Sequence, residues 1–542
     1  MVVRRRVVLV VKAMTTDRKN ALMILGTASH VGKSILTAGL GRILSDDGYR
    51  VAPFKAQNMS LNSAATLDGG EIGRAQALQA EACRVPATVD MNPVLLKPST
   101  DTGAQVILLG KIWGQVTASD YHTHRVEELF PQVIDAFQRL AARHDLILLE
   151  GAGSPAEVNL RAHDIVNMRM AHAADAACVL VGDIDRGGVF ASLLGTMELL
   201  DREDRARIRG FIINKFRGDR ALLQPGIEMI EQRLQLPCVG VVPFLRSLGL
   251  DEEDGVALEE RATVARRWKD DEAKPSRPLR VGAIALPHMA NFTDFDALHA
   301  EPAVALAFVE NAQDLVAADL VILPGSKQTL DDLGWLERRG FVHEIRGHAA
   351  VGGPIIGICG GLQMLGAVIE DPHGVENGGA PCRRAGLGLL PIRTVLHEQK
   401  TVSCVEGRIK NEFFWSGLSA GLTFDGYEIH VGETVYETGA APFAEIARAG
   451  SAAVVADGAV NDSGRILGTY VHGLFDDDDF RHAFIDAARA AVGLAPAQAY
   501  ACVRAERQAR IERLANHIRN SLNMPLLRSF IEQPLKGHCF LG

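Results

Sequence analysis

The sequence predicts an α/β protein made of two doubly wound domains, each built on a mostly parallel sheet. Its 542 residues exceed what a single hydrophobic core usually supports. From Ala21 onward, short runs of β-branched or leucine residues alternate with helical patterns, which is typical of a parallel sheet covered on both faces. The alternation fails between Glu252 and Arg280 and then begins again, so we expect a linker there and a second sheet after it.

The predicted elements define the organisation of the chain. The clearest strands are expected at 21–25, 145–150, 176–183 and 209–214 in the first half, and at 280–286, 319–325 and 354–360 in the second. The charged stretch 261–280 carries two prolines, which favours a linker. We therefore expect an N-terminal extension (1–20), a first domain (21–255), a linker (256–278), a second domain (279–492) and a C-terminal helical extension (493–542).

The charge balance favours small-molecule chemistry over nucleic-acid binding. A formal charge of -9, from 57 basic and 66 acidic residues, provides no basic patch for a nucleic-acid backbone. The eight cysteines form no CxxC pair and no zinc-site spacing, which indicates a reducing, cytoplasmic setting. No apolar run is long and charge-free enough to span a bilayer, so we expect no membrane contact. The oligomeric state is unknown from the sequence.

A phosphate-binding loop is predicted at GTASHVGKS, Gly26 to Ser34, because it follows a strand and opens a helical pattern. Backbone N–H groups around Gly26, Thr27 and Gly32 would approach the phosphates of ATP. Lys33 would neutralise phosphate charge, and the Ser34 hydroxyl would bind Mg²⁺. The first glycine lies one residue earlier than the usual spacing. This form resembles dethiobiotin synthetase and its relatives, which use ATP to activate a carboxylate.

Polar residues at other strand ends complete the predicted nucleotide site. Glu150 in LLEGAGSP and Asp183 in VGDIDRGG are expected to hold Mg²⁺, since the carboxyl ends of parallel strands meet at one edge of a sheet. The segment INKFRGD, 213–219, resembles the base-contacting loop of this superfamily, which implies that Asn214 contacts adenine.

Cys359 is the predicted nucleophile of the second domain. GICGG, 357–361, lies between an apolar strand and a helical pattern, which is typical of the sharp turn that exposes a reactive thiol. His472 in GTYVHGLF ends another predicted strand and is expected to be the partner base. LPGSK, 323–327, would supply a backbone N–H at Gly325 for the oxyanion, together with the N–H of Gly360.

These features resemble class I glutamine amidotransferase domains, with one departure. The family usually has a glutamate two residues after the histidine, and this chain has Leu474. The resemblance therefore leaves open what orients His472. It points to the branch of the family that contains the cobyric acid and cobyrinic acid diamide synthases, which also lack the glutamate.

Motifs in order from about Met23 to Phe475 resemble the cobyric acid synthase family. They are GTASHVGKS, FKAQNMSLNS, GGEIGRAQ, MNPVLLKP, EGAGSPAE, DIDRGGVF, NKFRGD, GICGGLQMLG, GYEIHVG and GTYVHGLF. The resemblance implies a P-loop NTPase-like domain followed by a class I glutamine amidotransferase-like domain. It also implies that glutamine, ATP and Mg²⁺ are used to amidate four peripheral carboxylates of adenosylcobyrinic acid a,c-diamide in cobalamin biosynthesis. Residues implied near this corrinoid polycarboxylate are Lys55, Gln57, Asn58, Asn92, Asp164 and Arg186.

Two alternatives remain open. Cobyrinic acid a,c-diamide synthase has the same two domain types, although it is not expected to carry FKAQNMSLNS and MNPVLLKP in this form. A partition-type ATPase switch with a non-catalytic glutaminase-like module belongs to a different functional class. Cys359, His472 and the Lys33 loop argue against that switch.

Overall fold

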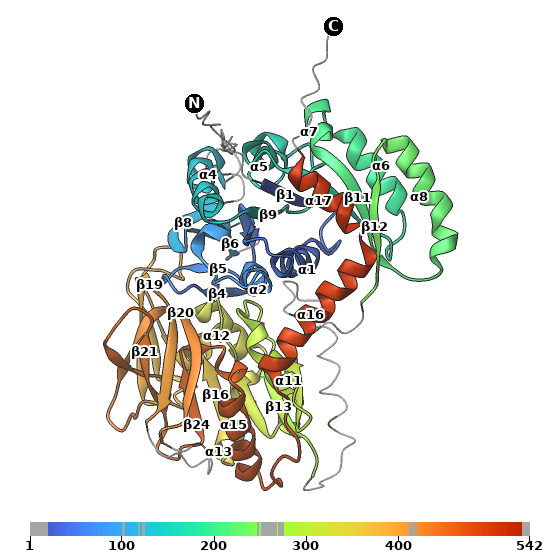
Figure 1. Ribbon diagram of the computed structural model, residues 1–542. Coiled ribbons are helices and arrows are strands. Elements are labelled where there is room, and N and C mark those ends of the chain that lie inside the picture. The colour runs from blue at the N-terminus through green and yellow to red at the C-terminus, as the bar shows by residue number, and fades with distance from the viewer. Residues whose placement is uncertain are drawn as a thin grey trace, which may run out of the picture.

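The chain forms two α/β bodies that lie one above the other in Figure 1. The computed structural model describes residues 20–99, 103–117, 120–121, 125–245, 249–250, 268, 276–410, 418 and 420–533. The predicted N-terminal extension, apart from Asn20, lies outside these residues. So does most of the predicted linker at 256–278. Among the described helices, none combines the length and the apolar character needed to cross a membrane.

The first body is built on a fully parallel six-stranded sheet, as the sequence predicts. Its strand order is β12-β11-β10-β1-β9-β2. The strands are β1 (Asn20–Gly26), β2 (Val51–Phe54), β9 (Leu146–Glu150), β10 (Ala177–Asp183), β11 (Ile208–Phe216) and β12 (Cys238–Pro243). Because the strands are parallel, the loops that follow β1, β9, β10 and β11 gather at one edge of the sheet.

Helices cover both faces of this sheet, and the alternation of side chains along β1 shows why. Met23 and Leu25 belong to one buried apolar cluster, while Leu22 and Ile24 belong to another. Both faces must therefore be covered. The covering helices are α1 (Lys33–Asp46), α2 (Arg74–Ala82), α4 (Val126–Arg143), α5 (Met168–Ala173), α6 (Val189–Leu199), α7 (Arg202–Arg207) and α8 (Arg220–Leu234), with short 3₁₀ turns η1 (Val89–Met91) and η3 (Arg161–His163).

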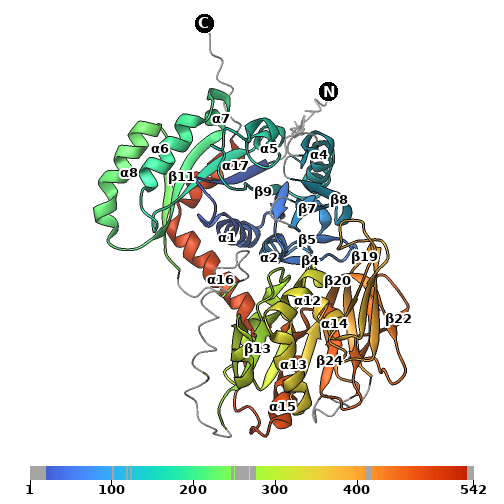
Figure 2. The ribbon, with the colours of Figure 1, turned by 180° about the vertical axis from the view of Figure 1, so that it is seen from behind.

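Two C-terminal helices complete one of these faces, α16 (Val503–Ser521) and α17 (Met524–Glu532). Figure 2 shows both in red, with α17 on the first body and α16 running from the first body toward the second. Leu514 and Ile518 of α16 pack on α1, where a Cβ added to Gly39 would lie 2.3 Å from Ile518 Cδ1. The two helices of the C-terminal extension, to which the sequence assigns no role, thus pack into the core of the first body.

Small sheets extend the first body toward the second. One has the order β3-β6-β7-β8, and the other is the pair β4-β5. These strands are β3 (Gln57–Met59), β4 (Ser63–Ala65), β5 (Glu71–Gly73), β6 (Val94–Pro98), β7 (Gly103–Leu108) and β8 (Lys111–Thr117). Figure 1 places β4, β5 and β6 between the main parallel sheet and the second body.

The second body also contains a mostly parallel sheet, with the order β14-β13-β15-β16-β24-β23, in which only the β23–β24 pair is antiparallel. Its strands are β13 (Leu279–Ile284), β14 (Val304–Val309), β15 (Leu320–Leu323), β16 (Ile355–Ile358), β23 (Ala459–Val460) and β24 (Ile466–Thr469). Its helices are α11 (Asp296–His299), α12 (Thr329–Arg338), α13 (Phe341–Ala350), α14 (Gly360–Leu365) and α15 (Asp478–Ala491), with 3₁₀ turns η5 (Phe292–Phe295), η6 (Ala312–Ala317) and η7 (Leu474–Asp476).

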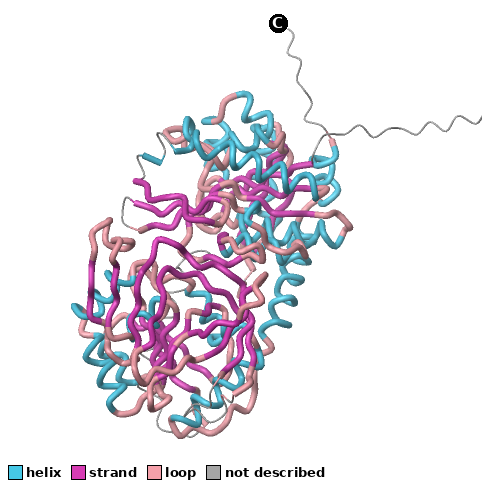
Figure 3. The backbone as a smooth tube through the Cα atoms, turned by 90° about the vertical axis from the view of Figure 1, so that its left-hand side faces the viewer, coloured by secondary structure: helices cyan, strands magenta, loops and turns pink. Residues whose placement is uncertain are grey.

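A second, largely antiparallel sheet packs beside it, and Figure 3 shows its long strands in magenta in the lower half of the molecule. The order is β18-β17-β19-β20-β25, with β21 and β22 joined through β19. The strands are β17 (Val368–Asp371), β18 (Cys382–Ala385), β19 (Ile392–Ile409), β20 (Thr423–Tyr436), β21 (Ala444–Arg448), β22 (Val454–Asp457) and β25 (Val471–His472). The sequence analysis does not predict this sheet.

Candidate functional site

The predicted phosphate-binding loop lies between β1 and α1. Gly32 has φ +97°, and a Cβ there would lie 2.3 Å from Nδ2 of Asn214, so the turn requires glycine. Lys33 Nζ donates to the carbonyl oxygens of Ala28 (2.9 Å) and Gly153 (3.0 Å). This geometry holds the ammonium over the loop at the N-terminus of α1, where phosphate oxygens would be bound.

Glu150, at the end of β9, is the centre of a buried polar cluster. Its Oε1 accepts hydrogen bonds from Ser34 Oγ (2.7 Å) and Lys55 Nζ (2.9 Å), and its Oε2 accepts one from Gln79 Nε2 (2.6 Å). Burial opposes the charge on Glu150, but Lys55 and these hydrogen bonds hold its pKa below the ordinary value. The carboxylate is therefore ionised at neutral pH.

The oxygens of Ser34 and Glu150 fit a magnesium site. Mg²⁺ usually takes one or two protein oxygens and fills its remaining positions with phosphate oxygens and water. Within the described parts of the chain, no cluster of three His, Cys, Asp or Glu side chains is arranged to hold a metal ion. A magnesium ion bound with ATP does not need one. Asp183, the other predicted ligand, pairs with Lys215 (3.0 Å) and accepts a hydrogen bond from the N–H of Asp185.

Asn214 lies at the phosphate-binding loop. It extends from β11, and its Nδ2 donates to the carbonyl oxygen of Val31 (2.8 Å). This bond fixes the loop backbone just before Gly32. The adenine contact expected of Asn214 stays a prediction.

The six residues implied near the corrinoid differ in their contacts and in their exposure. Lys55 is buried against Glu150, and Asn58 Nδ2 donates to Gln76 (3.0 Å). Asn92 is buried and accepts a hydrogen bond from the N–H of Gly73 (3.0 Å). The others are Gln57, which accepts a bond from Tyr121 Oη, Asp164, which accepts bonds from the N–H groups of Val166 and Asn167, and Arg186, which is exposed.

Cys359 occupies a strained turn between β16 and α14. Its φ of +52° with ψ of -108° is rare for a residue other than glycine. The neighbouring glycines are sterically required, because a Cβ on Gly361 would lie 2.0 Å from the carbonyl oxygen of Leu323. The backbone N–H of Cys359 donates to Thr469 (2.8 Å), which ties the turn to β24. The predicted strand 354–360 thus ends at Ile358, so that the thiol is presented outside the sheet.

His472 lies beside Cys359, because both residues line the same pocket. The Cys359 thiol itself donates to the carbonyl oxygen of Ile429 (3.6 Å). Gly325 lies next to both, because a Cβ on Gly325 would be 3.0 Å from His472 Cε1 and 3.8 Å from Cys359 Cβ. Gly360 is also close, since a Cβ on it would lie 2.9 Å from the backbone nitrogen of Ser326. The proposed oxyanion donors therefore flank the thiol.

Asp294 is the carboxylate that contacts His472 in place of the glutamate that the sequence motif lacks. Its Oδ2 lies 2.6 Å from His472 Nδ1, and its Oδ1 accepts a hydrogen bond from the N–H of Gly473 (3.0 Å). His472 and Asp294 are 1% and 3% exposed. Leu474, at the usual glutamate position, is buried. Asp294 lies in η5, ten residues after the end of β13, whereas Glu150 is the last residue of β9, so the strand-end rule that selected Glu150 does not select Asp294.

The electrostatics of His472 follow from this contact. Burial disfavours its charge, but the carboxylate of Asp294 outweighs burial and, with Cys359, raises the pKa of His472 to about 10. The imidazole is therefore protonated at neutral pH. An imidazolium beside a thiol favours the thiolate, which is the nucleophilic form.

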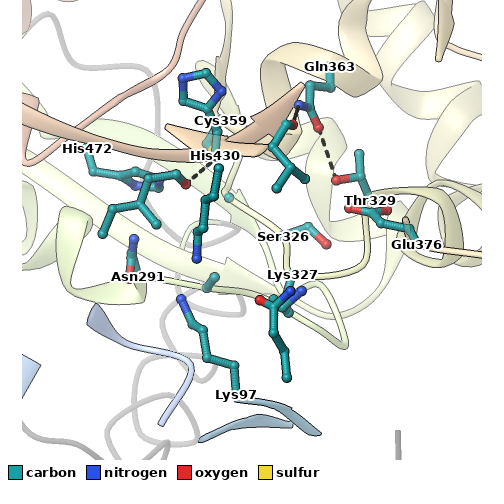
Figure 4. Close-up of a pocket in the computed structure, with 16 residues that line it drawn as sticks. Lys97, Asn291, Ser326, Lys327, Thr329, Cys359, Gln363, Glu376, His430 and His472 are labelled. Carbon is teal, nitrogen blue, oxygen red and sulfur yellow. Dashed lines mark hydrogen bonds between the residues drawn. The ribbon is translucent and has the colours of Figure 1, made fainter. Parts of the chain in front are cut away.

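The pocket in front of the thiol is lined by both bodies of the molecule. Figure 4 shows Cys359, His472, His430, Gln363, Glu376 and Lys327 of the second body around it, with Lys97 entering from a strand of the first. Gln363 is fixed by Thr329 Oγ1 (3.2 Å) and by the carbonyl oxygen of Val431 (3.0 Å). The pocket thus combines a nucleophile with groups of both charges.

Comparisons with known proteins identify both bodies. Residues 22–257 match the CobQ/CobB/MinD/ParA nucleotide binding domain, and residues 280–480 match the CobB/CobQ-like glutamine amidotransferase domain. A protein named cobyric acid synthase from Sorangium cellulosum is 47% identical over 93% of this chain and 97% of its own length. Proteins with the same name from Klebsiella pneumoniae and Moorella thermoacetica are each 46% identical over 96% of this chain and 99% of their own length.

Proposed function

The chain belongs to the cobyric acid synthase family, and we propose that it amidates four peripheral carboxylates of adenosylcobyrinic acid a,c-diamide. Family membership makes it an ATP-dependent enzyme of cobalamin biosynthesis with glutamine as nitrogen donor. The observation that carries the proposal is that one chain holds both a thiol, imidazole and carboxylate arrangement and a phosphate-binding loop with a buried carboxylate. One site would release ammonia, and the other would activate the acid.

At the first step Cys359 attacks the side-chain amide carbon of glutamine. The N–H groups of Gly325 and Gly360 would stabilise the oxyanion, and His472 would give its proton to the departing ammonia. Water then attacks the thioester with His472 as base, which releases glutamate and restores the thiol. Asp294 is the positioning residue that keeps the imidazole in the required orientation and charge state.

At the second site a carboxylate oxygen of the corrinoid attacks the γ-phosphorus of ATP, and ADP leaves. Ammonia then attacks the acyl phosphate carbon, and inorganic phosphate leaves as the amide forms. Lys33 would hold the phosphates by charge, and Ser34 and Glu150 would hold Mg²⁺, which would neutralise charge on the transferring phosphoryl group. Lys55 contacts Glu150, which also bonds Ser34, and this supports placing the segment of Lys55, Gln57 and Asn58 beside the phosphate-binding loop. We infer a reducing, cytoplasmic setting because Cys359 must remain a thiol.

Mass spectrometry of the corrinoid product tests the proposed substrate. Incubation of the diamide with ATP, Mg²⁺ and glutamine should give four successive products, each lighter by about one mass unit as OH becomes NH₂. The diamide should disappear only when ATP is present. An enzyme that amidates unmodified cobyrinic acid and leaves the diamide untouched would instead be a cobyrinic acid a,c-diamide synthase.

Cys359→Ser tests the division of labour between the two sites. Glutamine-dependent synthesis should fall by about a thousandfold or more, because a serine hydroxyl is far less ionised than the thiolate. Synthesis with ammonium chloride should survive, since the ATP site needs ammonia from any source. Equal losses with both nitrogen donors would remove Cys359 from the proposal.

A further inference from the structure

The first body contributes a wall to the pocket around Cys359. Lys97, the lysine of MNPVLLKP, lies in β6 one residue before its end and lines this pocket together with Gln105 of β7. Its side chain is 3% exposed. The motif that contains Lys97 also contains Asn92, which the resemblance implies near the corrinoid, but the lysine itself faces the glutaminase pocket (Figure 4).

Lys97 is held in place by a buried ion cluster between the two bodies. Its Nζ donates to Glu71 Oε1 (2.5 Å) and Ser63 Oγ (3.0 Å), both of the first body. Glu71 Oε2 accepts a hydrogen bond from Nζ of Lys400, which belongs to β19 and also lines the pocket. An ammonium group has three donors, and acceptors in the described part of the chain use two of them, so Lys97 can offer the third to a pocket ligand.

The pocket carries an excess of positive charge. Lys97, Lys327 and Lys400 line it, whereas Glu376 is the one carboxylate among the described lining residues, with Glu71 and Asp294 behind the wall. Burial lowers the pKa of Lys400 to about 7 and lowers that of Lys327 as well. Burial alone would raise the pKa of Glu71, but Lys400 and Lys97 hold it far below the ordinary value. A bound anion would stabilise the charged forms of these buried lysines.

Glutamine carries a negative charge at the end opposite its side-chain amide. Its side-chain amide must reach Cys359, and the opposite end carries an α-carboxylate and an α-ammonium group. We propose that Lys97 binds the α-carboxylate of glutamine, so that the glutaminase pocket is complete only when the first body is docked. Glu376 is then the counterpart of the α-ammonium group. This inference rests on the proposed glutaminase activity of Cys359.

Lys97→Met tests the inference through glutamine hydrolysis measured without corrinoid. We expect KM for glutamine to rise about 10- to 100-fold with little change in kcat, which is what losing one charge-assisted hydrogen bond costs. The second readout is inhibition of this reaction by 4-aminobutanamide, which is glutamine without its α-carboxylate. The inhibition constant of 4-aminobutanamide should hardly change in the variant. The preference of the enzyme for glutamine over 4-aminobutanamide should therefore fall by the same factor as the KM for glutamine rises.

Two further variants serve as controls. Lys97→Arg keeps a cation at the same strand position and should restore part of the affinity for glutamine. Lys111→Met removes an exposed lysine of β8, in the same small sheet, and should leave both constants unchanged. Glu71 should stay paired in Lys97→Met, because Lys400 still contacts it.

The proposal is overturned if Lys97→Met weakens the binding of glutamine and of 4-aminobutanamide by the same factor, which would mean that the pocket has merely lost its shape. It is also overturned if KM rises for the corrinoid and stays constant for glutamine, which would assign Lys97 to the other substrate. Failure of the proposed function gives a different result, since ammonium-dependent amidation of the diamide would then be absent from the wild-type enzyme as well.

Discussion

At the scale of single residues, the contact between Asp294 and His472 decides how the thiol is activated. The carboxylate lies 2.6 Å from Nδ1, and both side chains are buried. Without that charge, burial would act on the imidazole with only Cys359 to oppose it. The protonated state of His472 therefore depends on a residue that the usual family motif does not contain.

We predict that Asp294→Asn lowers kcat for glutamine hydrolysis by about 10²- to 10⁴-fold, as loss of the orienting carboxylate does in comparable triads. The pH profile should also change. In the wild type, the pKa of about 10 keeps His472 protonated across the neutral range. In the variant that pKa falls, so the alkaline limb of the kcat profile should move to lower pH.

Exposed Asp331, on α12, supplies the matched control for this experiment. Asp331→Asn should leave both kcat and the pH profile as in the wild type. Ammonium-dependent synthesis should continue in both variants. An alkaline limb that stays in place in Asp294→Asn would show that Asp294 does not set the charge of His472.

The sequence predicts residues that define their own turn and misses those that only the fold brings together. Cys359 lies between glycines that its turn requires, and Lys33 lies in a loop with a recognisable spacing. Asp294 is 178 positions from His472 and stands in a short turn between two phenylalanines, where nothing local distinguishes it from a surface aspartate. Lys97 is found in a motif, yet most of the residues that line the pocket with it come from the other body.

At the scale of elements, the turn η5 that carries Asp294 is fastened to the first body. Asn62 Oδ1 accepts a hydrogen bond from the N–H of Phe292 (3.2 Å), and the N–H of Ser63 donates to Asn291 Oδ1 (2.9 Å). Asn291 has φ +54°, so the chain there is held in a conformation that most residues avoid. The segment of Asn62 and Ser63 thus supports the turn from outside its own domain.

We predict that Asn62→Ala lowers kcat for glutamine hydrolysis several-fold, because a buried N–H left without its acceptor costs about 1–3 kcal/mol and the turn can relieve this by moving. The alkaline limb should shift in the same direction as in Asp294→Asn, but less far. Rates measured without corrinoid isolate this effect from any role of Asn62 in substrate binding. Asn516→Ala, at an exposed position of α16, is the control. A pH profile identical to that of the control would contradict the support assigned to Asn62.

The parallel strands were predictable, and the antiparallel sheet was not, for a physical reason. The strands β1, β9 and β10 are buried along almost their whole length, so they appear in the sequence as continuous apolar runs. The strands β19 and β20 are long but mix exposed, partly buried and buried positions, and they contain charged residues. A strand with one solvent-exposed face and with interdomain contacts does not appear as a continuous apolar run.

At the scale of the whole molecule, α16 ties the two bodies together. Arg504 pairs with Asp425 (3.0 Å) of the second body, whereas Arg507 and Gln508 bond Glu81 of the first (2.7 and 2.6 Å). Figure 1 shows this helix, in red, running from the lower body to the upper one. The helix therefore belongs to the first core and fixes the position of the second.

We predict that Ile518→Ala destabilises the first body, because its side chain fills the space between α16 and Gly39 of α1. Removing a fully buried isoleucine side chain usually costs about 2–5 kcal/mol. For a domain of this size, that corresponds to a fall in Tm on the order of 5–15 °C. Differential scanning calorimetry should show the loss in the transition that ATP shifts upward, because a ligand stabilises the body that binds it. Glu512→Ala changes an exposed residue of the same helix and should leave that transition almost in place. A shift in Ile518→Ala no larger than in Glu512→Ala would mean that α16 only rests on the phosphate-binding body, and that the C-terminal helices contribute nothing to the core behind the ATP site.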